Sequence, residues 1–141
     1  MSSNNDTIRH RASAIIIKDR KLLLVTGSAL DIYWTPGGKI DYGETAEQAL
    51  VRELQEELGL INVTLAPYFS YIGPAEDRQG YHFYETTEDC FLVKTTEDIG
   101  IAAEIEKSHW FAAGEIEANK PEVLGHIKSI LLPRLTSDNL L

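Results

Sequence analysis

Short apolar runs alternate with polar turn residues in the first part of the chain. Residues 14–17 and 22–25 are two such runs, rich in isoleucine, leucine and valine, and the charged residues 18–21 separate them. Apolar runs of this length on either side of a polar turn predict a β-hairpin. Further strands are expected at residues 33–35, 62–72, 88–94 and 109–112.

A longer segment, residues 45–58, has the pattern of an amphipathic helix. Its apolar residues recur at every fourth position: Ala46, Leu50, Leu54 and Leu58. Thr45 and Gln48 have the spacing of a capping box, in which each side chain bonds the backbone N–H of the other residue. Gly59 stands where a glycine usually ends a helix. We therefore expect one helix with an apolar face packed against the core.

A second helix is predicted over residues 121–132, where apolar residues share one helical face and Pro121 takes the first position. Residues 73–81 and 95–107 are predicted to be surface loops, and the polar tail after Pro133 is expected to fray. Two main helices among several strands predict an α/β layered sandwich, although the pattern does not give the order of the strands.

Composition narrows the class of protein. The chain has 141 residues, a length that fits one ordinary domain. Its net charge of −9 disfavours binding to a nucleic-acid polymer, whose phosphates are also negative. The polar residues 1–7 lack the apolar stretch of a signal peptide, and no run reaches the length of a membrane span, so no membrane contact and a cytoplasmic location are expected. The one cysteine, Cys90, excludes an intrachain disulfide and is interpreted as a buried structural residue.

Three glutamates of the first predicted helix form the candidate chemical site. Glu53 lies three residues before Glu56 and four before Glu57, and both spacings place side chains on one helical face. Like charges so close together repel each other, and a hard divalent cation with oxygen ligands would offset the repulsion. Glutamates on a solvated helix face are also common, and Arg52 with Glu56 makes an ordinary helix pair. The spacing alone therefore leaves both interpretations open.

The wider pattern around these glutamates resembles the signature of the Nudix hydrolase family. That signature is a glycine, five residues, a glutamate, seven residues, then Arg-Glu, an aliphatic residue, any residue, Glu-Glu, any residue, glycine and an aliphatic residue. The matching residues are Gly38, Glu44, Arg52, Glu53, Leu54, Glu56, Glu57, Gly59 and Leu60. We call this segment, residues 38–60, the box. The preceding residues 34–39 also resemble the family, and the general resemblance extends over about residues 8–132.

The resemblance implies a fold and a domain organisation. The expected fold is the Nudix-type α/β/α sandwich with a central mixed β-sheet, formed by one domain over residues 8–135. Residues 1–7 and 136–141 would then be a flexible N-terminal segment and a flexible tail. Members of this family often form homodimers, and the sequence does not decide whether this chain does.

The resemblance also implies roles for the residues of the box. Glu53, Glu56 and Glu57 match the metal ligands, with the backbone carbonyl of Gly38 as a further ligand, and the expected cofactor is Mg²⁺ or Mn²⁺. Arg52 belongs to the catalytic set with Glu53 and Glu56. Arg52 also matches, together with Glu44, positions that hold the loop against the helix. Gly59 has a structural role at the helix end.

The implied reaction is the hydrolysis of a phosphoanhydride bond by water attack at phosphorus. The substrate would be a nucleoside diphosphate linked to another group, such as a nucleoside triphosphate, ADP-ribose or a nucleotide sugar. The general base varies within the family, so Glu56 and the later acids Glu104 and Glu106 stay open. Glu97 and Asp98 belong to the same acidic segment.

Substrate contacts are expected from aromatic and basic residues near the box, for which Trp34, Arg11 and Tyr71 are the candidates. Two other functions compete with hydrolysis. A catalytically silent Nudix-fold module would bind or sense a nucleotide without cleaving it, but such modules usually lose box acids. A metal-buffering acidic domain would need the carboxylates alone, and the glycine and arginine positions speak against it.

Overall fold

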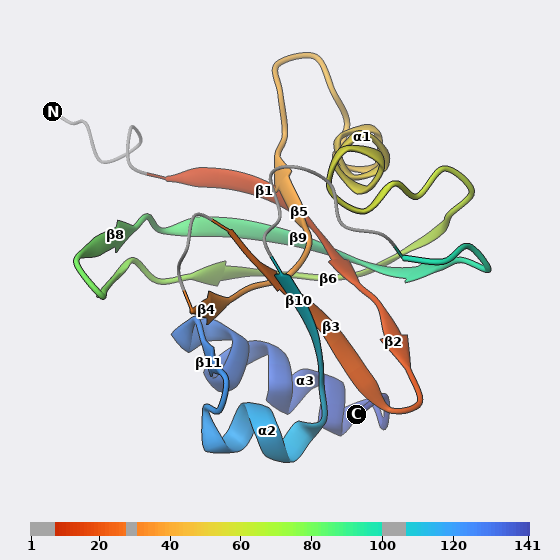
Figure 1. Cartoon of the computed structure of the whole chain (residues 1–141). Coiled ribbons are helices and arrows are strands. Elements are labelled where there is room, and N and C mark those ends of the chain that lie inside the picture. The colour runs from red at the N-terminus through yellow and green to blue at the C-terminus, as the bar shows by residue number, and fades with distance from the viewer. Residues whose placement is uncertain (1–7, 28–30, 100–106) are drawn as a thin grey trace, which may run out of the picture.

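The structure, a computed structural model, describes residues 8–27, 31–99 and 107–141 (Figure 1). The strands are β1 (Arg9–Ile15), β2 (Ile17–Lys18), β3 (Lys21–Thr26), β4 (Ile32–Tyr33), β5 (Gly37–Lys39), β6 (Thr64–Gly73), β7 (Glu76–Arg78), β8 (Tyr81–Phe83), β9 (Thr86–Lys94), β10 (Lys107–Phe111) and β11 (Glu122–Val123). The helices are α1 (Ala46–Leu58), α2 (Ala113–Ala118), the π-helical turn η2 (Ile127–Leu131) and α3 (Leu132–Ser137). None of the helices in these residues is long and apolar enough to cross a membrane.

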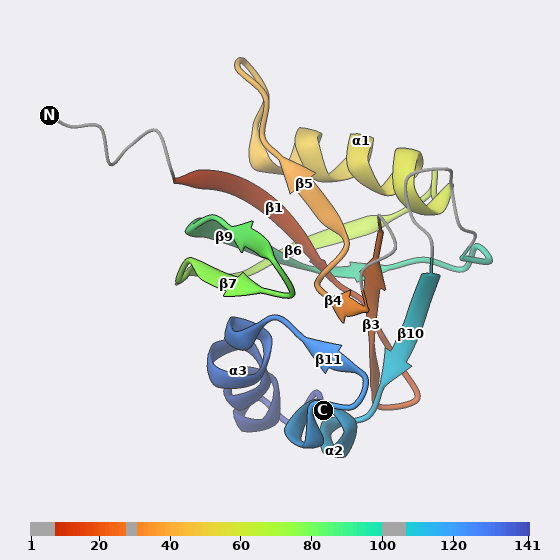
Figure 2. The same cartoon turned by 60° about the vertical axis from the view of Figure 1, so that its left-hand side comes forward.

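The strands form a mixed central sheet between two helical layers. One sheet has the order β5-β1-β9-β6, in which β1 and β9 run parallel and the other pairs are antiparallel. A second sheet has the order β10-β3-β2. Helix α1 lies on one side of the sheets, and α2 and α3 lie on the other (Figure 2). This arrangement confirms the predicted α/β/α sandwich with a central mixed sheet.

Each helical layer buries its own hydrophobic core against the strands. On the α1 side, Leu50, Leu54 and Leu58 pack with Ala12 and Ala14 of β1. On the other side, residues of η2 and α3 pack with β3, β4 and β10. Because side chains alternate along a strand, Arg11 and Ser13, on either side of Ala12, face away from α1.

The predicted hairpin is present, but its first strand serves two sheets. Strand β1 ends at Ile15 in the central sheet, and β2 begins at Ile17 and pairs with β3 in the other. Asp19 and Arg20 have φ angles of 53° and 57° and form the two-residue turn, which is the left-handed geometry that favours a tight hairpin. Strands β4, β6, β9 and β10 also fall on the segments predicted to be extended, with ends shifted by a few residues.

Helix α1 has the ends that its sequence predicts. The Thr45 side chain accepts a hydrogen bond from the Gln48 N–H, and the Gln48 side chain accepts one from the Thr45 N–H. Gly59 follows the helix with φ 68°, a left-handed conformation that glycine adopts without steric cost. The capping box fixes the start of the helix, and so sets where the glutamates of the box lie.

The segment predicted to be a loop at residues 73–81 is instead a second hairpin, formed by β7 and β8. Gln79 and Gly80 have φ angles of 52° and 82° and make its turn. Arg78 binds Glu122 at 2.5 Å and so fastens the hairpin to the segment after α2. The loop prediction was wrong because the charged residues of this short hairpin hide its alternation.

The C-terminal region also differs from its prediction. Pro121 does not start a helix, since it precedes strand β11, and the helical part begins later, at η2. Helix α3 follows η2 directly and runs through Pro133 to Ser137, with the proline in its first turn. Of the expected flexible tail, residues 136–141, the first two end α3 and residues 136–139 are exposed, whereas Leu141 is 7% exposed and packs in the core. Helix α2 was not predicted.

Candidate active site

The two glycines of β5 allow this strand to lie directly against α1. Gly37 has φ 135°, and a Cβ atom there would lie 2.0 Å from the Ala12 carbonyl oxygen. A Cβ atom on Gly38 would lie 2.4 Å from the carboxyl carbon of Glu53. The Gly37 N–H donates a hydrogen bond to Glu57 Oε1 at 2.8 Å. The carboxylates of Glu53 and Glu57 therefore both lie against the backbone of β5. A side chain at residue 37 would meet the backbone of β1, and one at residue 38 would displace the Glu53 carboxylate.

Arg52 ties the loop before α1 to the helix. Its guanidinium donates to both carboxylate oxygens of Glu44 at 2.8 and 2.9 Å, and to the Lys39 carbonyl oxygen at 3.1 Å. It also donates to Glu53 Oε1 at 2.8 Å. The hydrogen bond from Arg52 lowers the pKa of Glu44 to about 2. The structure thus brings together Arg52 and Glu44 as the resemblance implied, and it adds Glu53 to the same guanidinium.

The three box glutamates differ in exposure. The side chains of Glu53 and Glu56 are 15% and 51% exposed, and Glu57 is 7% exposed. Burial raises the pKa of Glu53, and the bond from Arg52 opposes this shift. Glu56 Oε2 lies 3.5 Å from Arg52 Nη1. The helix therefore presents two sheltered carboxylates and one that reaches solvent.

The donors suit a hard divalent cation, although Arg52 engages one of them. Oxygen ligands are those that Mg²⁺ and Mn²⁺ prefer, and the Gly38 backbone lies against the Glu53 carboxylate. Among the described residues, no three His, Cys, Asp or Glu side chains already converge as a metal-binding group. The box glutamates therefore have the oxygen donors that such a cation prefers. In this structure the Arg52 guanidinium lies beside Glu53 and Glu56 and partly neutralises their negative charge.

A cavity of about 400 Å³ opens on the face of the central sheet away from α1. Its floor includes Arg9, Arg11 and Lys39, and aromatic residues such as Trp34 and Phe83 form part of its wall. We call it the floor-arginine cavity. Two of the three predicted substrate residues, Arg11 and Trp34, line it. The third, Tyr71, is not among the residues of its lining.

Arg11 is held in this floor by a buried carboxylate that sequence reasoning missed. Arg11 Nη1 lies 2.9 Å from Glu88 Oε1, and Glu88 also accepts a hydrogen bond from Ser13. Arg11 Nη2 donates to the Thr35 carbonyl oxygen at 3.1 Å. Burial raises the pKa of Glu88, but the charge of Arg11 and the Ser13 bond outweigh it, and the pKa lies below its ordinary value.

Tyr71 and His126 form a second buried contact beside this pair. The Tyr71 hydroxyl and His126 Nδ1 are 2.8 Å apart, and His126 lines the cavity. Burial raises the pKa of Tyr71 and lowers the pKa of His126. Tyr71 therefore supports the wall of the cavity through His126. No pattern in the sequence indicated His126, because the long-range packing of a single histidine leaves no local signal.

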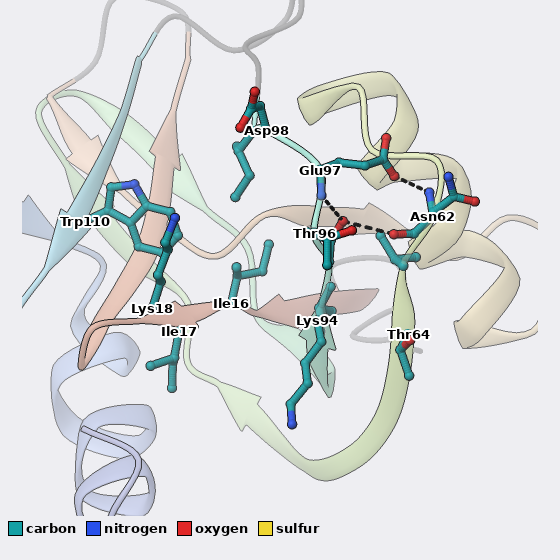
Figure 3. Close-up of a pocket in the computed structure, with 14 residues that line it drawn as sticks. Ile16, Ile17, Lys18, Asn62, Thr64, Lys94, Thr96, Glu97, Asp98 and Trp110 are labelled. Atoms are coloured by element: carbon teal, nitrogen blue, oxygen red, sulfur yellow. Dashed lines mark hydrogen bonds between the residues drawn. The ribbon is translucent and has the colours of Figure 1, made fainter.

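A larger open cavity of about 1030 Å³ lies elsewhere, and none of the residues of α1 is in its described lining (Figure 3). Lys18 and Trp110 lie at this cavity. Glu97, one of the later acids, accepts hydrogen bonds from the backbone N–H groups of Ile61, at 3.0 Å, and Asn62. Glu97 is thus tied to the segment that follows α1. Size alone does not mark this cavity as the reaction site, because the box carboxylates lie elsewhere.

The other two candidate bases from the later segment, Glu104 and Glu106, lie outside the described residues. Gly59 caps α1 as expected. The predicted roles in metal binding and catalysis are not tested by the positions of these residues, and they stay predictions.

The NUDIX domain family matches residues 8–132 of the chain. Because this match covers most of the 141 residues, the chain belongs to the Nudix hydrolase family, as its box predicted. A solved MutT NUDIX hydrolase from Burkholderia pseudomallei has the same fold, with a TM-score of 0.60 and 26% sequence identity. That likeness covers 90% of this chain and 97% of the other.

Two relatives show the range of activities among similar proteins. An ADP-ribose pyrophosphatase of Methanocaldococcus jannaschii is 39% identical over 70 residues, which are 48% of this chain and 41% of the relative. An 8-oxo-dGTP diphosphatase of Escherichia coli is 46% identical over 54 residues, which are 35% of this chain and 42% of the relative. The similarity thus spans less than half the length of either relative.

Proposed function

We propose that this protein is a divalent-metal-dependent hydrolase that cleaves a phosphoanhydride bond in a nucleoside diphosphate linked to another group. One observation carries this proposal: the carboxylates of Glu53 and Glu57 meet the backbone of Gly37 and Gly38 at the edge of a sheet that also carries a basic cavity. Family membership supports it, because relatives are named as a pyrophosphatase and a diphosphatase.

Glu53, Glu56 and Glu57 would hold the metal, with the Gly38 carbonyl oxygen as a further donor. We propose Mg²⁺, with Mn²⁺ as an alternative, because both accept hard oxygen ligands. When bound, such a cation lowers the pKa of water and neutralises charge on the pyrophosphate. Gly38 leaves room for the Glu53 carboxylate in this arrangement, since a Cβ atom at residue 38 would force that side chain to shift.

The reaction is a substitution at phosphorus. A water oxygen forms a new bond to phosphorus, the bridging P–O bond breaks, and the departing phosphate keeps the electron pair. The water proton passes to a carboxylate, for which we propose Glu56, because its side chain is 51% exposed and can reach solvent. Glu104 or Glu106 is the alternative base. Because Glu56 is also proposed as a metal ligand, the later acids decide the test: Glu104→Gln and Glu106→Gln should each keep most of kcat if Glu56 is the base, and one of them should lose at least about 100-fold if the base is a later acid.

Arg52 has an organising role in this proposal. Its guanidinium fixes the loop at Glu44 and Lys39 and reaches Glu53, so it sets the position of that carboxylate. Its positive charge also limits the repulsion among the box glutamates when they approach each other. Arg52 therefore acts on the reaction through Glu53, and we place it in the catalytic set for that reason.

The floor-arginine cavity would bind the nucleoside part of the substrate. Trp34 supplies an aromatic face for a base, and Arg11 supplies a cation for a phosphate. The volume of about 400 Å³ is in the range of small-molecule sites. Nucleoside triphosphates, ADP-ribose, 8-oxo-dGTP and nucleotide sugars are the substrate classes to compare, because the relatives act on ADP-ribose and 8-oxo-dGTP by their names.

The test is a hydrolysis screen over these substrates and dinucleoside polyphosphates, with Mg²⁺ or Mn²⁺ and a chelator control. Release of phosphate or pyrophosphate from one class, abolished by the chelator, would support the proposal and name the substrate. Turnover that continues in the chelator, or no turnover of any substrate with either metal, would contradict it.

A silent nucleotide-binding module is the second candidate, and the engagement of Glu53 by Arg52 favours it. It predicts nucleotide binding in the same cavity without any metal-dependent release. The cytoplasmic location, the absence of membrane or nucleic-acid partners and the homodimer stay predictions.

A further inference from the structure

Four residues lie side by side across the central sheet in one row. Lys39 of β5 is opposite Arg11 of β1, Arg11 is opposite Glu88 of β9, and Glu88 is opposite Tyr71 of β6. The row lies on the face away from α1, because the neighbouring Ala12 packs with the α1 core. Three of the four, all but Tyr71, line the floor-arginine cavity.

Glu88 lies beside Arg11 in this row and is closed off from solvent. The Glu88 side chain is 1% exposed and that of Arg11 is 17% exposed. A group as buried as Glu88 has little surface to offer a ligand, whereas part of the guanidinium still faces the cavity. Ser13 bonds both members of this pair, and Thr35 bonds Arg11. The orientation of Arg11 is therefore set by buried partners, and only its outer edge can meet a substrate.

Arg11 also lies close to the box carboxylates. Ser13 is two residues further along β1 and pairs with Gly37, whose N–H binds Glu57. The charges of Arg11 and Glu57 act on each other, as do those of Arg11 and Glu53. Arg11 thus belongs both to the lining of the cavity and to the strand that pairs with the β5 glycines beside the box carboxylates.

We infer that Glu88 is a positioning residue that holds the Arg11 guanidinium ready to bind the phosphate attached to the nucleoside. This inference rests on the proposed function for its ligand, a nucleoside phosphate, but it concerns binding and requires no turnover. An arginine side chain binds phosphate through two parallel N–H bonds, so the strength of binding depends on how firmly the plane of the guanidinium is held. The buried Glu88 carboxylate fixes that plane from the neighbouring strand, because it pairs with Arg11 at 2.9 Å.

The experiment compares nucleoside 5′-monophosphates with the matching nucleosides by titration calorimetry in a chelator. The probes are AMP, GMP, CMP and UMP and their four nucleosides, so no metal and no hydrolysis are involved. For the wild-type protein we expect at least one monophosphate to bind about 10-fold more tightly than its nucleoside. Glu88→Gln should remove most of this difference and leave the affinity for the nucleoside unchanged.

The matched control is Asp89→Asn, which removes one carboxylate charge from the next residue of β9. Asp89 faces the other side of the sheet and accepts a hydrogen bond from Ser70. The affinity of the Asp89→Asn protein for the monophosphate should therefore stay within about 2-fold of wild type. Should Glu88→Gln fail to fold, Glu88→Asp keeps the buried charge but withdraws it by one methylene. Glu88→Asp should also bind the monophosphate several-fold more weakly and the nucleoside equally well.

The inference is overturned if no monophosphate binds more tightly than its nucleoside, or if a folded Glu88 variant keeps the full difference. It is also overturned if the variants weaken the nucleoside and the monophosphate alike, since that is the mark of a general structural role. Failure of the hydrolysis screen with intact phosphate discrimination would instead contradict the proposed function alone. Absence of discrimination in the wild-type protein, with intact metal-dependent turnover, would contradict only the role of Glu88.

Discussion

Two arginines of this protein bind carboxylates in opposite ways. The partners of Arg52 are 1, 8 and 13 residues away in sequence, at Glu53, Glu44 and Lys39, and its side chain is 30% exposed. Besides Ser13 on its own strand, Arg11 bonds Thr35 and Glu88, which are 24 and 77 residues away, and its side chain is 17% exposed. The first arginine organises a local loop, and the second joins strands that meet only in the folded chain.

This difference has energetic consequences. Ion pairs at the surface contribute little to stability, because water screens them. A buried pair is costly to break, since removing one partner leaves the other charge without compensation in the interior. We therefore expect changes at Arg52 to disturb the reaction and leave the fold intact, and changes at Arg11 to disturb both.

The largest expected effect is the loss of turnover when a glutamate of α1, the helix that Arg52 organises, is changed. Glu57→Gln and Glu53→Gln should each lower metal-dependent kcat/KM by about 100-fold or more, because an amide is a weaker ligand than a carboxylate. Steady-state kinetics with Mg²⁺ provides the measurement. Glu47→Gln, on the exposed first turn of the same helix, is the control and should keep full activity. Unchanged turnover in Glu57→Gln would show that the metal ligands are assigned wrongly.

The second effect separates the two arginines directly. Arg11→Ala should destabilise the protein by about 3–5 kcal/mol, because Glu88 then becomes a buried unpaired charge. Arg52→Ala should change the free energy of unfolding by no more than about 1 kcal/mol, because its pairs are partly exposed. Urea denaturation measures both. Equal losses of stability in the two variants would contradict the distinction between a buried pair and a surface network.

The smallest effect concerns the pH dependence of the Arg52 network. The pKa of Glu44 is lowered from 4.5 to about 2 by its bond to Arg52, so the folded state holds fewer protons than the unfolded state between these values. The stabilisation is complete above pH 4.5 and is lost as the pH falls toward about 2. The difference in Tm between wild type and Glu44→Gln should shrink over this range. A difference that is constant or grows on acidification would argue against this contact.

The contrast between the arginines also explains what the sequence could and could not predict. The box, the helix and its caps depend on neighbours within a few turns, so their spacing is visible in the chain, and Thr45, Gln48 and Gly59 stand where they were expected. The partnership of Arg11 with Glu88 depends on the register between two parallel strands. That register is fixed by the packing of the whole sheet, and nothing near either residue encodes it.

The errors in the predicted fold have the same origin. Hairpin β7–β8 is held by the bond between Arg78 and Glu122, which are 44 residues apart in sequence. Because this partner is distant, the charged residues of the hairpin were interpreted as those of a solvated loop. Pro121 resembled a helix start because the apolar positions after it fit one face, yet residues 122–123 pair with β4 instead. Local propensity was overridden by tertiary pairing in both cases.

The most direct test of the proposed reaction is hydrolysis of the substrate found in the screen in water enriched with ¹⁸O, followed by mass spectrometry of the products. The account predicts that one ¹⁸O atom enters a phosphoryl group of one product, only when Mg²⁺ or Mn²⁺ is present and not in Glu57→Gln. Label attached to carbon, or equal incorporation in a chelator, would contradict metal-dependent attack of water at phosphorus.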